Sequence, residues 1–441
     1  MHLHRSKLRK FGWLYGTRVW YKFQREIIRR GLDIGMERQG SIVGKTAIIL
    51  APDDKGLRAV FGIPAVRRLS LLTFQLGLTE IHIVGQVQAL QPILSDLVPP
   101  ERFHPVEDPA SLGRVIERLA LPERQRVLVL KANHVMDRSS LIRLIEAGDS
   151  LDLHYMEATG KKGTERLYLT TPPHLISILA QLWSPSSHLP YLAKAQPVEG
   201  VDGFPAVLEG GEEQAKLVEG KLMQALASQT KGTDGFLARH VNRRISRFIS
   251  KRLVLTRVTP NQITLAGATI GMTGAFLLSW TGYWPKLVGS LLFLFCIIVD
   301  GVDGEIARLK LKATSFGHYL DVVTDNLVHI AIFLGIALGL YRDSGDPGYL
   351  HILWILIGGF GLCGLAVYQC ILRRDPEELR RSVKTIRIMA MLSNRDFAYI
   401  VVVLALVQRL HWFLIGAAVG TYLFAATLWL TSFYEKRAIA Q

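Results

Sequence analysis

Four aspartates stand in one of the most apolar parts of the chain. They are Asp300, Asp303, Asp321 and Asp325, all within VDGVDGEIARLKLKATSFGHYLDVVTD, residues 299–325. A carboxylate inside a membrane is costly, and such residues normally face a bundle interior or a wet cavity and mark a functional site. The stretch therefore predicts a site in which these carboxylates do chemistry.

The spacing of the aspartates predicts that they meet. The first two are three residues apart, so they share one helix face, and the second two continue a four-residue stripe from Gly317. A short basic turn between the helices makes them antiparallel neighbours. With a rise of about 1.5 Å per residue, Asp300 lies about 12 Å below Arg308, which marks the cytoplasmic helix end. The cluster is thus expected in the cytoplasmic half of the membrane.

Close carboxylates predict bound cations. Like charges at short range raise each other's pKa, so four aspartates cannot all stay ionised without positive charge nearby. Oxygen-only ligation suits Mg²⁺ or Mn²⁺ and disfavours Zn²⁺. Two such ions would balance the charge and could bridge a pyrophosphate. Gly304 and Gly317 would let a ligand approach the helices closely, and Arg308 could hold a phosphate.

Two other interpretations use the same residues. The aspartates could be helix-end carboxylates paired with neighbouring Arg and Lys, although two facing stripes argue against this. A cation or proton transport site would also place carboxylates in the membrane. Transport would not require Gly304, Arg308 and Gly317 at this spacing.

The pattern resembles the signature of the CDP-alcohol phosphotransferase (CDP-alcohol phosphatidyltransferase) family. Residues 300–308, DGVDGEIAR, are followed after eight residues by residues 317–325, GHYLDVVTD, and every fixed position of the family pattern is filled. We call residues 300–325 the signature. The preceding VTPNQIT and the basic helix before it are similar as well, so the resemblance covers about residues 235–437.

The resemblance implies a homodimeric six-helix membrane domain that binds two divalent ions and displaces CMP from a CDP-linked donor by an acceptor hydroxyl. Asp325 would also be the general base that deprotonates the acceptor. The metal ligands would be Asp300, Asp303, Asp321 and Asp325. The nucleotide-binding residues would be Gly304, Ala307, Arg308 and Gly317. Metal ions that neutralise a pyrophosphate and a protein that positions the reactants fit this reaction.

The distribution of hydropathy and charge predicts a soluble part followed by a membrane part. The chain has 441 residues, 49% hydrophobic, with a net charge of +15. Six spanning helices are expected near residues 262–281, 285–308, 315–341, 349–372, 396–409 and 412–433. Basic loops lie on one side only, which places both termini in the cytoplasm. Because the basic residues flank apolar segments, we expect no nucleic acid partner.

Four segments follow from this division. Residues 1–40 form a basic aromatic segment, 41–230 a cytoplasmic domain, 235–258 an amphipathic helix and 259–437 the membrane domain. In the helix, apolar residues such as Ile245 and Phe248 recur at helical spacing between arginines and lysines. This pattern predicts a helix in the membrane interface with its basic face to the headgroups.

The acceptor site is expected in the basic stretch between the fourth and fifth spans. The candidates there are Lys384 and Arg387, together with Arg395, which opens the fifth span. A phosphorylated polyol acceptor would need such charges. Anionic lipid headgroups would need them equally, so both interpretations stay open.

The N-terminal domain reads as α/β. Short apolar runs at 46–50, 80–85 and 126–132 alternate with helical patterns at 64–76 and 139–146, which predicts a parallel sheet. Residues 62–86 and 126–148 resemble parts of sugar-nucleotidyltransferase-like domains. Some members of the CDP-alcohol family carry such a domain and make their own CDP-alcohol there.

Here the nucleotidyltransferase motifs are incomplete. The first loop, LAPDDKGLR, has the single glycine Gly56, and Ala132-Asn133-His134 stand where the family has a metal-binding aspartate. A loop with few glycines offers few free backbone N–H groups to a triphosphate. We expect a degenerate, structural or regulatory domain. The alternative is an active cytidylyltransferase with substituted residues, for which the candidates are Asp53, Asp54, Lys55 and Asp137.

The sequence thus predicts a multi-domain protein of the cytoplasmic membrane, with an α/β domain and an all-α polytopic domain. It would act in phospholipid or related biosynthesis. The donor would be CDP-diacylglycerol or a CDP-alcohol, and the acceptor an alcohol such as a polyol phosphate. A bifunctional enzyme that also consumes CTP is the alternative within the same class.

Overall fold

The computed structural model describes residues 46–147, 153–160, 164–183, 195–200, 204–229, 238–372 and 396–440. It divides into two compact units, one within residues 34–229 with Leu309–Leu311, the other mainly residues 230–308 and 312–441. Each unit is described separately. The expected basic aromatic segment, residues 1–40, lies outside the described residues.

The N-terminal unit is built on a nine-stranded sheet whose centre contains the three predicted strands. These are β1 (Thr46–Ala51), β4 (Glu80–Gly85) and β6 (Val127–Lys131), and β1 pairs with both neighbours in parallel. The residues of β1 and β6 are buried throughout, as expected of strands covered on both faces. The prediction of an α/β domain is confirmed.

The prediction of a wholly parallel sheet is wrong in the second half of the domain. The strand β9 (Thr164–Thr170) pairs antiparallel with both β6 and β8 (His154–Thr159). The connection between β8 and β9 is too short for a crossover, so the two strands form a hairpin. The other strands of this sheet are β5 (Phe103–Pro105), β7 (His134–Val135), β10 (Gln196–Pro197) and β11 (Ala206–Val207). The order is β5-β4-β1-β6-β9-β8-β11-β7, with β10 beside β8.

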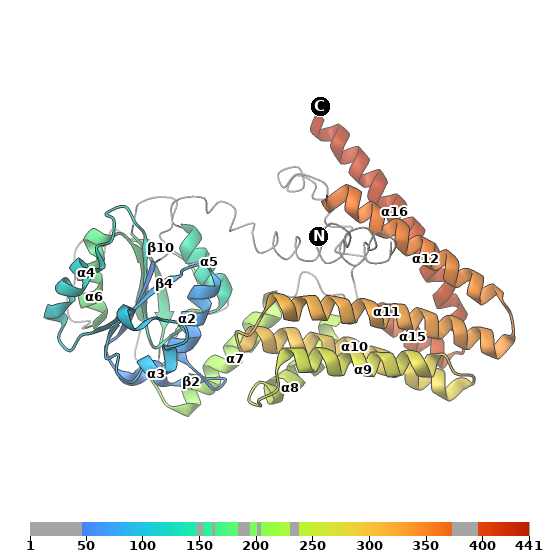
Figure 1. The fold of residues 1–441 in the computed structure, drawn as a ribbon, viewed down its shortest axis with the longest axis horizontal. Helices are drawn as coiled ribbons and strands as arrows, with labels where there is room; N and C mark the ends of the chain where they lie inside the picture. Colours follow the sequence, from blue (N-terminus) through green and yellow to red (C-terminus); the bar gives the residue numbers. More distant parts are fainter. Residues whose placement is uncertain are drawn as a thin grey trace, which may run out of the picture. The chain divides into compact units, whose positions relative to one another are not determined.

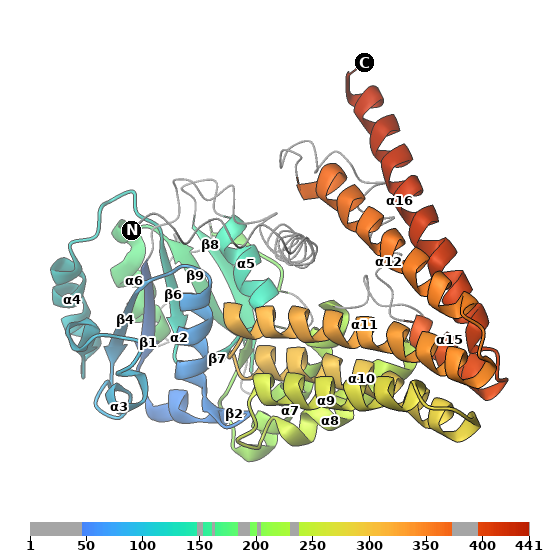
Figure 2. The ribbon, with the colours of Figure 1, turned by 45° about the vertical axis from the view of Figure 1, so that its right-hand side comes forward.

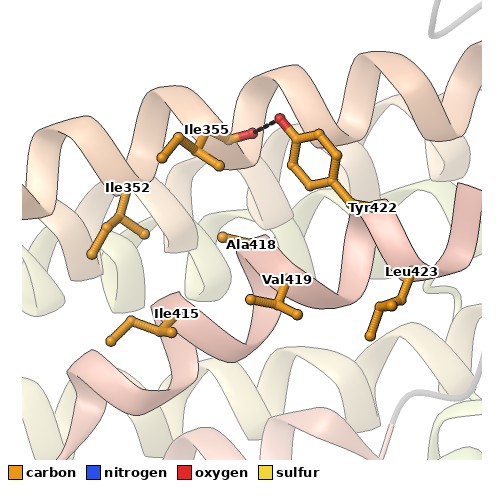
Figure 3. A pocket seen from close by; sticks show the side chains of 7 residues that line it. All are labelled: Ile352, Ile355, Ile415, Ala418, Val419, Tyr422 and Leu423. Atoms are coloured by element: carbon orange, nitrogen blue, oxygen red, sulfur yellow. Dashed lines mark hydrogen bonds between the residues drawn. The ribbon is translucent and has the colours of Figure 1, made fainter.

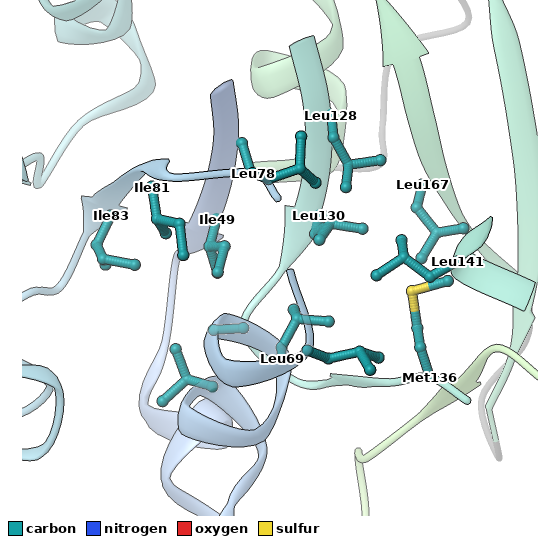
Figure 4. Close-up of a cluster of buried hydrophobic side chains, with 14 of the residues drawn as sticks. Ile49, Leu69, Leu78, Ile81, Ile83, Leu128, Leu130, Met136, Leu141 and Leu167 are labelled. Atoms are coloured by element: carbon teal, nitrogen blue, oxygen red, sulfur yellow. The ribbon is translucent and has the colours of Figure 1, made fainter. Parts of the chain in front are cut away.

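Helices cover both faces of this sheet (Figures 1 and 2). On one face, α2 (Ala65–Gln75) and α5 (Arg138–Glu146) pack on alternate strand residues. Figure 4 shows Leu69 of α2 below Ile49 and Leu130, and Leu141 of α5 beside Leu167 and Met136. On the other face lie α4 (Leu112–Leu119) and α6 (Pro172–Trp183). The remaining elements are α3 (Gln91–Leu94), α7 (Glu212–Gln229), the short hairpin β2 (Ala59–Val60) and β3 (Ile63–Pro64), and the 3₁₀ turns η3 (Asp54–Leu57), η4 (Pro100–Arg102) and η5 (Pro109–Ser111).

The C-terminal unit is helical. Its elements are the π turn η8 (Ala238–Asn242), α8 (Arg243–Leu253), α9 (Pro260–Leu278), α10 (Tyr283–Leu309), α11 (Ser315–Ser344), α12 (Gly348–Val367), the π turn η9 (Tyr368–Leu372), α15 (Phe397–Leu406) and α16 (Leu410–Ala440). Six of these helices lie where spans were predicted. The start of α9 follows from its sequence, since Thr259 and Gln262 form a capping box around Pro260.

Four of the helices are long and apolar enough to cross a membrane. They run over Tyr283–Leu309, Ser315–Ser344, Gly348–Cys370 and Leu410–Glu435. The helix α9 is not among them, and α15 has only 10 residues. At about 1.5 Å per residue a helix of that length covers half of a hydrocarbon core of about 30 Å. Within the residues that the structure describes, it thus gives a helical domain with four candidate spans, and the six predicted spans stay a prediction.

Small residues bring α9 close to its two neighbours. A Cβ atom added at Gly335 of α11 would lie 2.3 Å from the backbone oxygen of Ala275 on α9. Between α9 and α10, a Cβ at Gly274 would lie 2.9 Å from the backbone oxygen of Gly289. These glycines allow the backbones to approach, as in other membrane helix pairs. Figures 1 and 2 show the resulting α9–α11 layer, with α12 and α16 packed on each other.

Candidate active site

Two aspartates from neighbouring helices line one small cavity. Asp300 of α10 and Asp325 of α11 face it, and α9 closes it with Thr264 and Gly267. The cavity measures about 20 Å³, which is room for a single water molecule or ion. The faces of α10 and α11 therefore meet, as predicted, at Asp300 and Asp325.

Asp303 is held by a residue that the sequence did not single out. Its carboxylate is buried and accepts a hydrogen bond from the Thr264 hydroxyl of α9. It also lies close enough to Asp321 and Asp325 to repel both electrostatically. The segment VTPNQIT identified the start of α9, but nothing in it showed that Thr264 would turn toward the signature.

Asp321 has an unsatisfied oxygen. Its Oδ1 is buried and has no hydrogen-bond partner among the described residues. A buried acceptor without a donor costs about 1–3 kcal/mol, so such atoms normally indicate a missing ligand, water or ion. The arrangement indicates that this oxygen is available to a cation.

His329 is a second residue that sequence reasoning missed. It follows Asp325 by one helical turn, with Nδ1 3.3 Å from the Asp325 carboxylate Oδ1 and 2.7 Å from the Asp325 backbone oxygen. An imidazole at this distance can orient a carboxylate that accepts a proton. A histidine four residues after an aspartate on a helix is the signal that could have found it.

The donor set fits a hard divalent cation. Among the residues that line the cavity, Asp300, Asp325, Thr264 and Thr324 offer carboxylate and hydroxyl oxygens, which Mg²⁺ or Mn²⁺ prefers as ligands. The rest of the lining is Gly267, Ala268, Cys296 and Val328. Within the described ranges, no three His, Cys, Asp or Glu side chains stand close enough together to hold one ion. The assignment of the four aspartates as metal ligands therefore stays a prediction.

The nucleotide-site candidates differ in their surroundings. A Cβ at Gly304 would meet only the Arg308 guanidinium, at 3.6 Å, so the space above this glycine is open. The exposed Arg308 donates from Nε to the Gly304 backbone oxygen over 3.1 Å. At Gly317 a Cβ would lie 2.7 Å from Asn261 Oδ1 of α9 and 3.1 Å from Thr314 Oγ1. A side chain at position 317 would displace the Asn261 amide, so the packing of α9 on α11 favours glycine here independently of any ligand.

Ala307 lies on α10, half-buried, between Gly304 and the helix end. The acceptor candidates Lys384, Arg387 and Arg395 lie outside the described residues. Their assignment stays a prediction.

In the N-terminal unit, ion pairs occupy the place expected for a metal-binding aspartate. Lys131 Nζ lies 2.8 Å from Glu165 Oε1, and His134 Nε2 lies 3.0 Å from Glu165 Oε2. Because His134 Nδ1 accepts from the Lys131 backbone N–H, a neutral His134 donates from Nε2. Burial raises the pKa of Glu165, but its bonds from His134 and Lys131 outweigh burial and hold that pKa at about 2. Burial lowers the pKa of His134 and keeps it neutral.

The candidates for an active cytidylyltransferase have structural roles. Asp53 caps η3, and Asp137 caps α5 by accepting from two backbone N–H groups. Lys55 pairs with Asp53, whereas Asp54 begins η3. A Cβ at Gly56 would lie 2.7 Å from the Ala132 side chain. The loop therefore packs on the end of β6, which supports the interpretation of a degenerate domain.

A larger hollow lies elsewhere in the C-terminal unit. It measures about 430 Å³ and lies between α12 and α16, where Tyr422 donates to the Ile355 backbone oxygen over 2.9 Å (Figure 3). Its other lining residues are Ile352, Ile415, Ala418, Val419 and Leu423. Because none of them carries a charge or belongs to the signature, the small aspartate cavity is the better candidate for chemistry.

Comparison with known proteins agrees with this geometry. The family model described as CDP-alcohol phosphatidyltransferase matches residues 257–433. A "Bifunctional IPC transferase and DIPP synthase" of Aquifex aeolicus is 34% identical over 128 residues, 29% of this chain and 28% of the relative. A "Phosphatidylinositol phosphate synthase" of Corynebacterium glutamicum is 37% identical over 103 residues, 22% of this chain and 44% of the relative. The chain thus spans less than half the length of these relatives.

A solved structure shows a likeness at lower identity. The phosphatidylinositol phosphate synthase of Mycobacterium tuberculosis, with CDP-DAG bound, is 20% identical, with a TM-score of 0.28 over 44% of this chain and 92% of its own. The match of the family model contains the whole signature, from Asp300 to Asp325. The C-terminal region of this chain, residues 257–433, therefore contains a domain that matches the CDP-alcohol phosphatidyltransferase family model.

Proposed function

We propose that this protein transfers a substituted phosphate from a CDP-linked donor to an acceptor alcohol and releases CMP. One observation carries the proposal. The complete family signature folds so that Asp300 and Asp325, from adjacent helices, line one ion-sized cavity closed by α9. A transfer between two bound substrates needs such a site, in which fixed charges position the reactants.

The proposed roles are carried over from the family resemblance. Asp300, Asp303, Asp321 and Asp325 would hold two ions of Mg²⁺ or Mn²⁺. Bound there, the ions would neutralise the pyrophosphate and stabilise CMP as the leaving group. Asp325 takes the proton from the acceptor hydroxyl, and His329 orients its carboxylate. Gly304, Ala307, Arg308 and Gly317 shape the nucleotide site, with Arg308 at the exposed helix end.

The substrates are proposed from the names of the relatives. A phosphatidylinositol phosphate synthase joins a phosphatidyl group to an inositol phosphate, so CDP-diacylglycerol and a polyol phosphate are the first candidates. Arg395, Arg387 and Lys384 would bind the phosphate of that acceptor. Their charges suit a phosphate ester.

The membrane placement is also a proposal beyond the four candidate spans. All six helices would cross or enter the cytoplasmic membrane, with α8 in the interface and both termini in the cytoplasm. The basic residues Arg308, Lys310 and Lys312 follow the end of α10, whereas the loop after α11 is nearly neutral, which supports this orientation. The homodimer is proposed from the family resemblance.

The N-terminal domain is proposed as a degenerate nucleotidyltransferase-like domain. Its support is the pairing of Lys131, His134 and Glu165 at the end of β6, together with the capping roles of Asp53 and Asp137. The relatives described as bifunctional favour the alternative, in which this domain makes the CDP-alcohol from CTP.

The test is CMP release by the purified full-length protein with Mg²⁺ or Mn²⁺. CDP-diacylglycerol would be supplied with inositol phosphate, glycerol phosphate, free polyols or serine in turn. The proposal predicts metal-dependent release with one acceptor class. If no acceptor supports CMP release, a second assay with CTP and polyol or sugar phosphates tests the bifunctional alternative. If neither CMP release nor CTP consumption is detected, transferase chemistry is contradicted and cation transport is favoured.

A further inference from the structure

The buried face of α8 is polar. Asn242, Ser246 and Ser250 recur every four residues and form one stripe, which is almost wholly buried. Ile245 and Phe248 on the same helix are exposed. A surface helix of a soluble protein normally turns its apolar residues inward. Ile249 and Leu253 of α8 also pack inward, but a buried polar stripe beside them indicates that the stripe has a specific partner within the unit.

That partner is Glu305 of α10. Its side chain is only 3% exposed. Ser246 Oγ donates to Oε1 over 2.8 Å, and Ser250 Oγ donates to Oε2 over 2.7 Å. Arg243 Nη1 lies 3.4 Å from Oε1. Both carboxylate oxygens of Glu305 therefore accept hydrogen bonds from α8. A buried carboxylate that loses its hydrogen-bond partners is strongly unfavourable.

The contact lies on the part of α10 that carries the signature. Glu305 directly follows Gly304 and is two residues from Asp303. Next to Asp300, a Cβ at Gly301 would touch Arg243 Nη1 at 3.6 Å and the Ser246 Cβ at 3.7 Å. Within this segment of α10, Asp300 thus lines the cavity, whereas Glu305 faces α8.

Apolar contacts and a second hydrogen bond extend the contact between α8 and the rest of the unit. Ile249 and Leu253 pack against a buried cluster that includes Val302 and Ile306 of α10. At the other end, Tyr399 of α15 donates to Asn242 Oδ1 over 2.5 Å. The stripe therefore links α8 to two helices of the bundle.

We propose that Glu305 is a positioning residue, which ties α8 to α10 and so fixes the segment that carries Asp300 and Asp303. It touches neither the cavity nor a reacting group. Its removal should free α8 and loosen the signature segment of α10 together. The kinetic part of this inference rests on the proposed transferase function, whereas the structural part does not.

The first test is amide hydrogen exchange of the full-length protein, wild type against Glu305→Ala. Peptides from 243–253 and from 299–309 should exchange at least about tenfold faster in the variant, which corresponds to about 1.4 kcal/mol of lost local stability. Peptides of α12 should not change. If 243–253 or 299–309 exchanges as in the wild type, or if α12 loosens equally, the proposal is wrong.

The second test removes the donors from the other side. The double variant Ser246→Ala, Ser250→Ala should reproduce the exchange pattern of Glu305→Ala. The variant Glu305→Gln keeps part of the hydrogen bonding, so its exchange rates should lie between those of the wild type and of Glu305→Ala. Ser290→Ala is the matched control, because this buried serine of α10 donates only to the Lys286 backbone oxygen. An unchanged pattern in the double variant would overturn the role of the serine stripe.

The third test separates positioning from folding alone. The kcat of Glu305→Ala for CMP release should fall at least about tenfold while Ser290→Ala keeps the wild-type value, and Glu305→Gln should recover part of the loss. A freed α8 with wild-type kcat would overturn the positioning role. If the wild type releases no CMP, the proposed function fails, and the exchange of 299–309 alone decides whether Glu305 orders the signature.

Discussion

Thr264 of α9 donates a hydrogen bond to Asp303 of α10, and Thr264 also lines the cavity that Asp300 and Asp325 share. Three helices therefore contribute to the site, although the signature itself lies on two of them. The hydroxyl fixes one carboxylate while Asp321 keeps an oxygen unbonded. Because Asp303 is hydrogen-bonded and Asp321 keeps a free oxygen, substitutions of these two aspartates should have different effects on stability and metal binding.

Asp321→Asn should weaken metal binding without weakening the fold. The unbonded Oδ1 makes no hydrogen bond that the variant would lose, and removing a charge near Asp303 and Asp325 relieves repulsion. We expect an unchanged or higher Tm and at least about a tenfold higher Mg²⁺ requirement for activity. Tm and a Mg²⁺ titration of CMP release measure both.

Asp343→Asn is the matched control for this variant. Asp343, near the end of α11, pairs with the buried Lys286. Loss of that pair should lower Tm and leave the Mg²⁺ requirement unchanged. A lower Tm for Asp321→Asn with an unchanged Mg²⁺ requirement would contradict its assignment as a ligand.

Gly317→Ala should disturb the packing of α9 against α11. The added Cβ would lie 2.7 Å from Asn261 Oδ1, and overpacking of this kind costs roughly 1–3 kcal/mol. The double variant Gly317→Ala, Asn261→Ala tests why the glycine is needed. Recovery of both Tm and activity would assign packing alone. Recovery of Tm without activity would show that the nucleotide also needs the space at Gly317.

The stability of the N-terminal unit should depend on pH through the pair His82 and His104, with the buried His134 acting in the same direction. His82 Nδ1 and His104 Nε2 lie 3.1 Å apart, and burial lowers the pKa of both, that of His82 to about 4, with Arg102 and His104 acting in the same direction and Glu80 opposing. The unfolded chain, with a histidine pKa of about 6.5, binds more protons between these values. Stability is therefore complete above pH 6.5 and falls toward pH 4.

Unfolding of the full-length protein between pH 7 and pH 4 measures this effect. We expect a loss of roughly 1–2 kcal/mol after allowance for solvent screening of these half-buried rings. His82→Gln should flatten the pH dependence of the transition that belongs to residues 46–229. The same slope in the variant would show that other groups cause it.

Glu165→Gln should destabilise the N-terminal unit and change no nucleotide chemistry. The variant leaves the buried Lys131 ammonium without its carboxylate, at a cost of about 1–3 kcal/mol. Tm and CTP consumption with polyol phosphates measure the two effects. CTP turnover by the wild type would overturn the degenerate-domain interpretation. The alternative active domain would then be the better account.

Patterns along short stretches of the sequence predicted the strands and helices whose formation depends mainly on neighbouring residues. Short apolar runs predicted β1, β4 and β6, and hydropathy located the helices α9, α10, α11, α12, α15 and α16. The antiparallel pairing of β9 with β6 depends on contacts between segments far apart in the chain, so periodicity could not show it. Helix α15 ends at Leu406, short of the predicted residue 409, and Gln408 adopts a positive φ before α16 begins at Leu410.

The signature aspartates were found because four carboxylates in an apolar region are conspicuous. Their partners were not conspicuous. Thr264 and Asn261 are single polar residues near a helix start, and Glu305 looked like one more charge beside Asp303. Their importance comes from what they face across a helix interface, which sequence spacing along one helix does not encode.

The most direct test of the central claim is incorporation of labelled inositol phosphate into lipid by the full-length protein with CDP-diacylglycerol and Mg²⁺. Wild type, Asp325→Asn and the exposed-loop control Asp346→Asn would be compared. The account predicts that wild type and control form labelled lipid and release an equal amount of CMP. The transfer rate of Asp325→Asn should be lower by about 10²–10⁴-fold, as expected for removal of a general base. Wild-type rates in Asp325→Asn would contradict it.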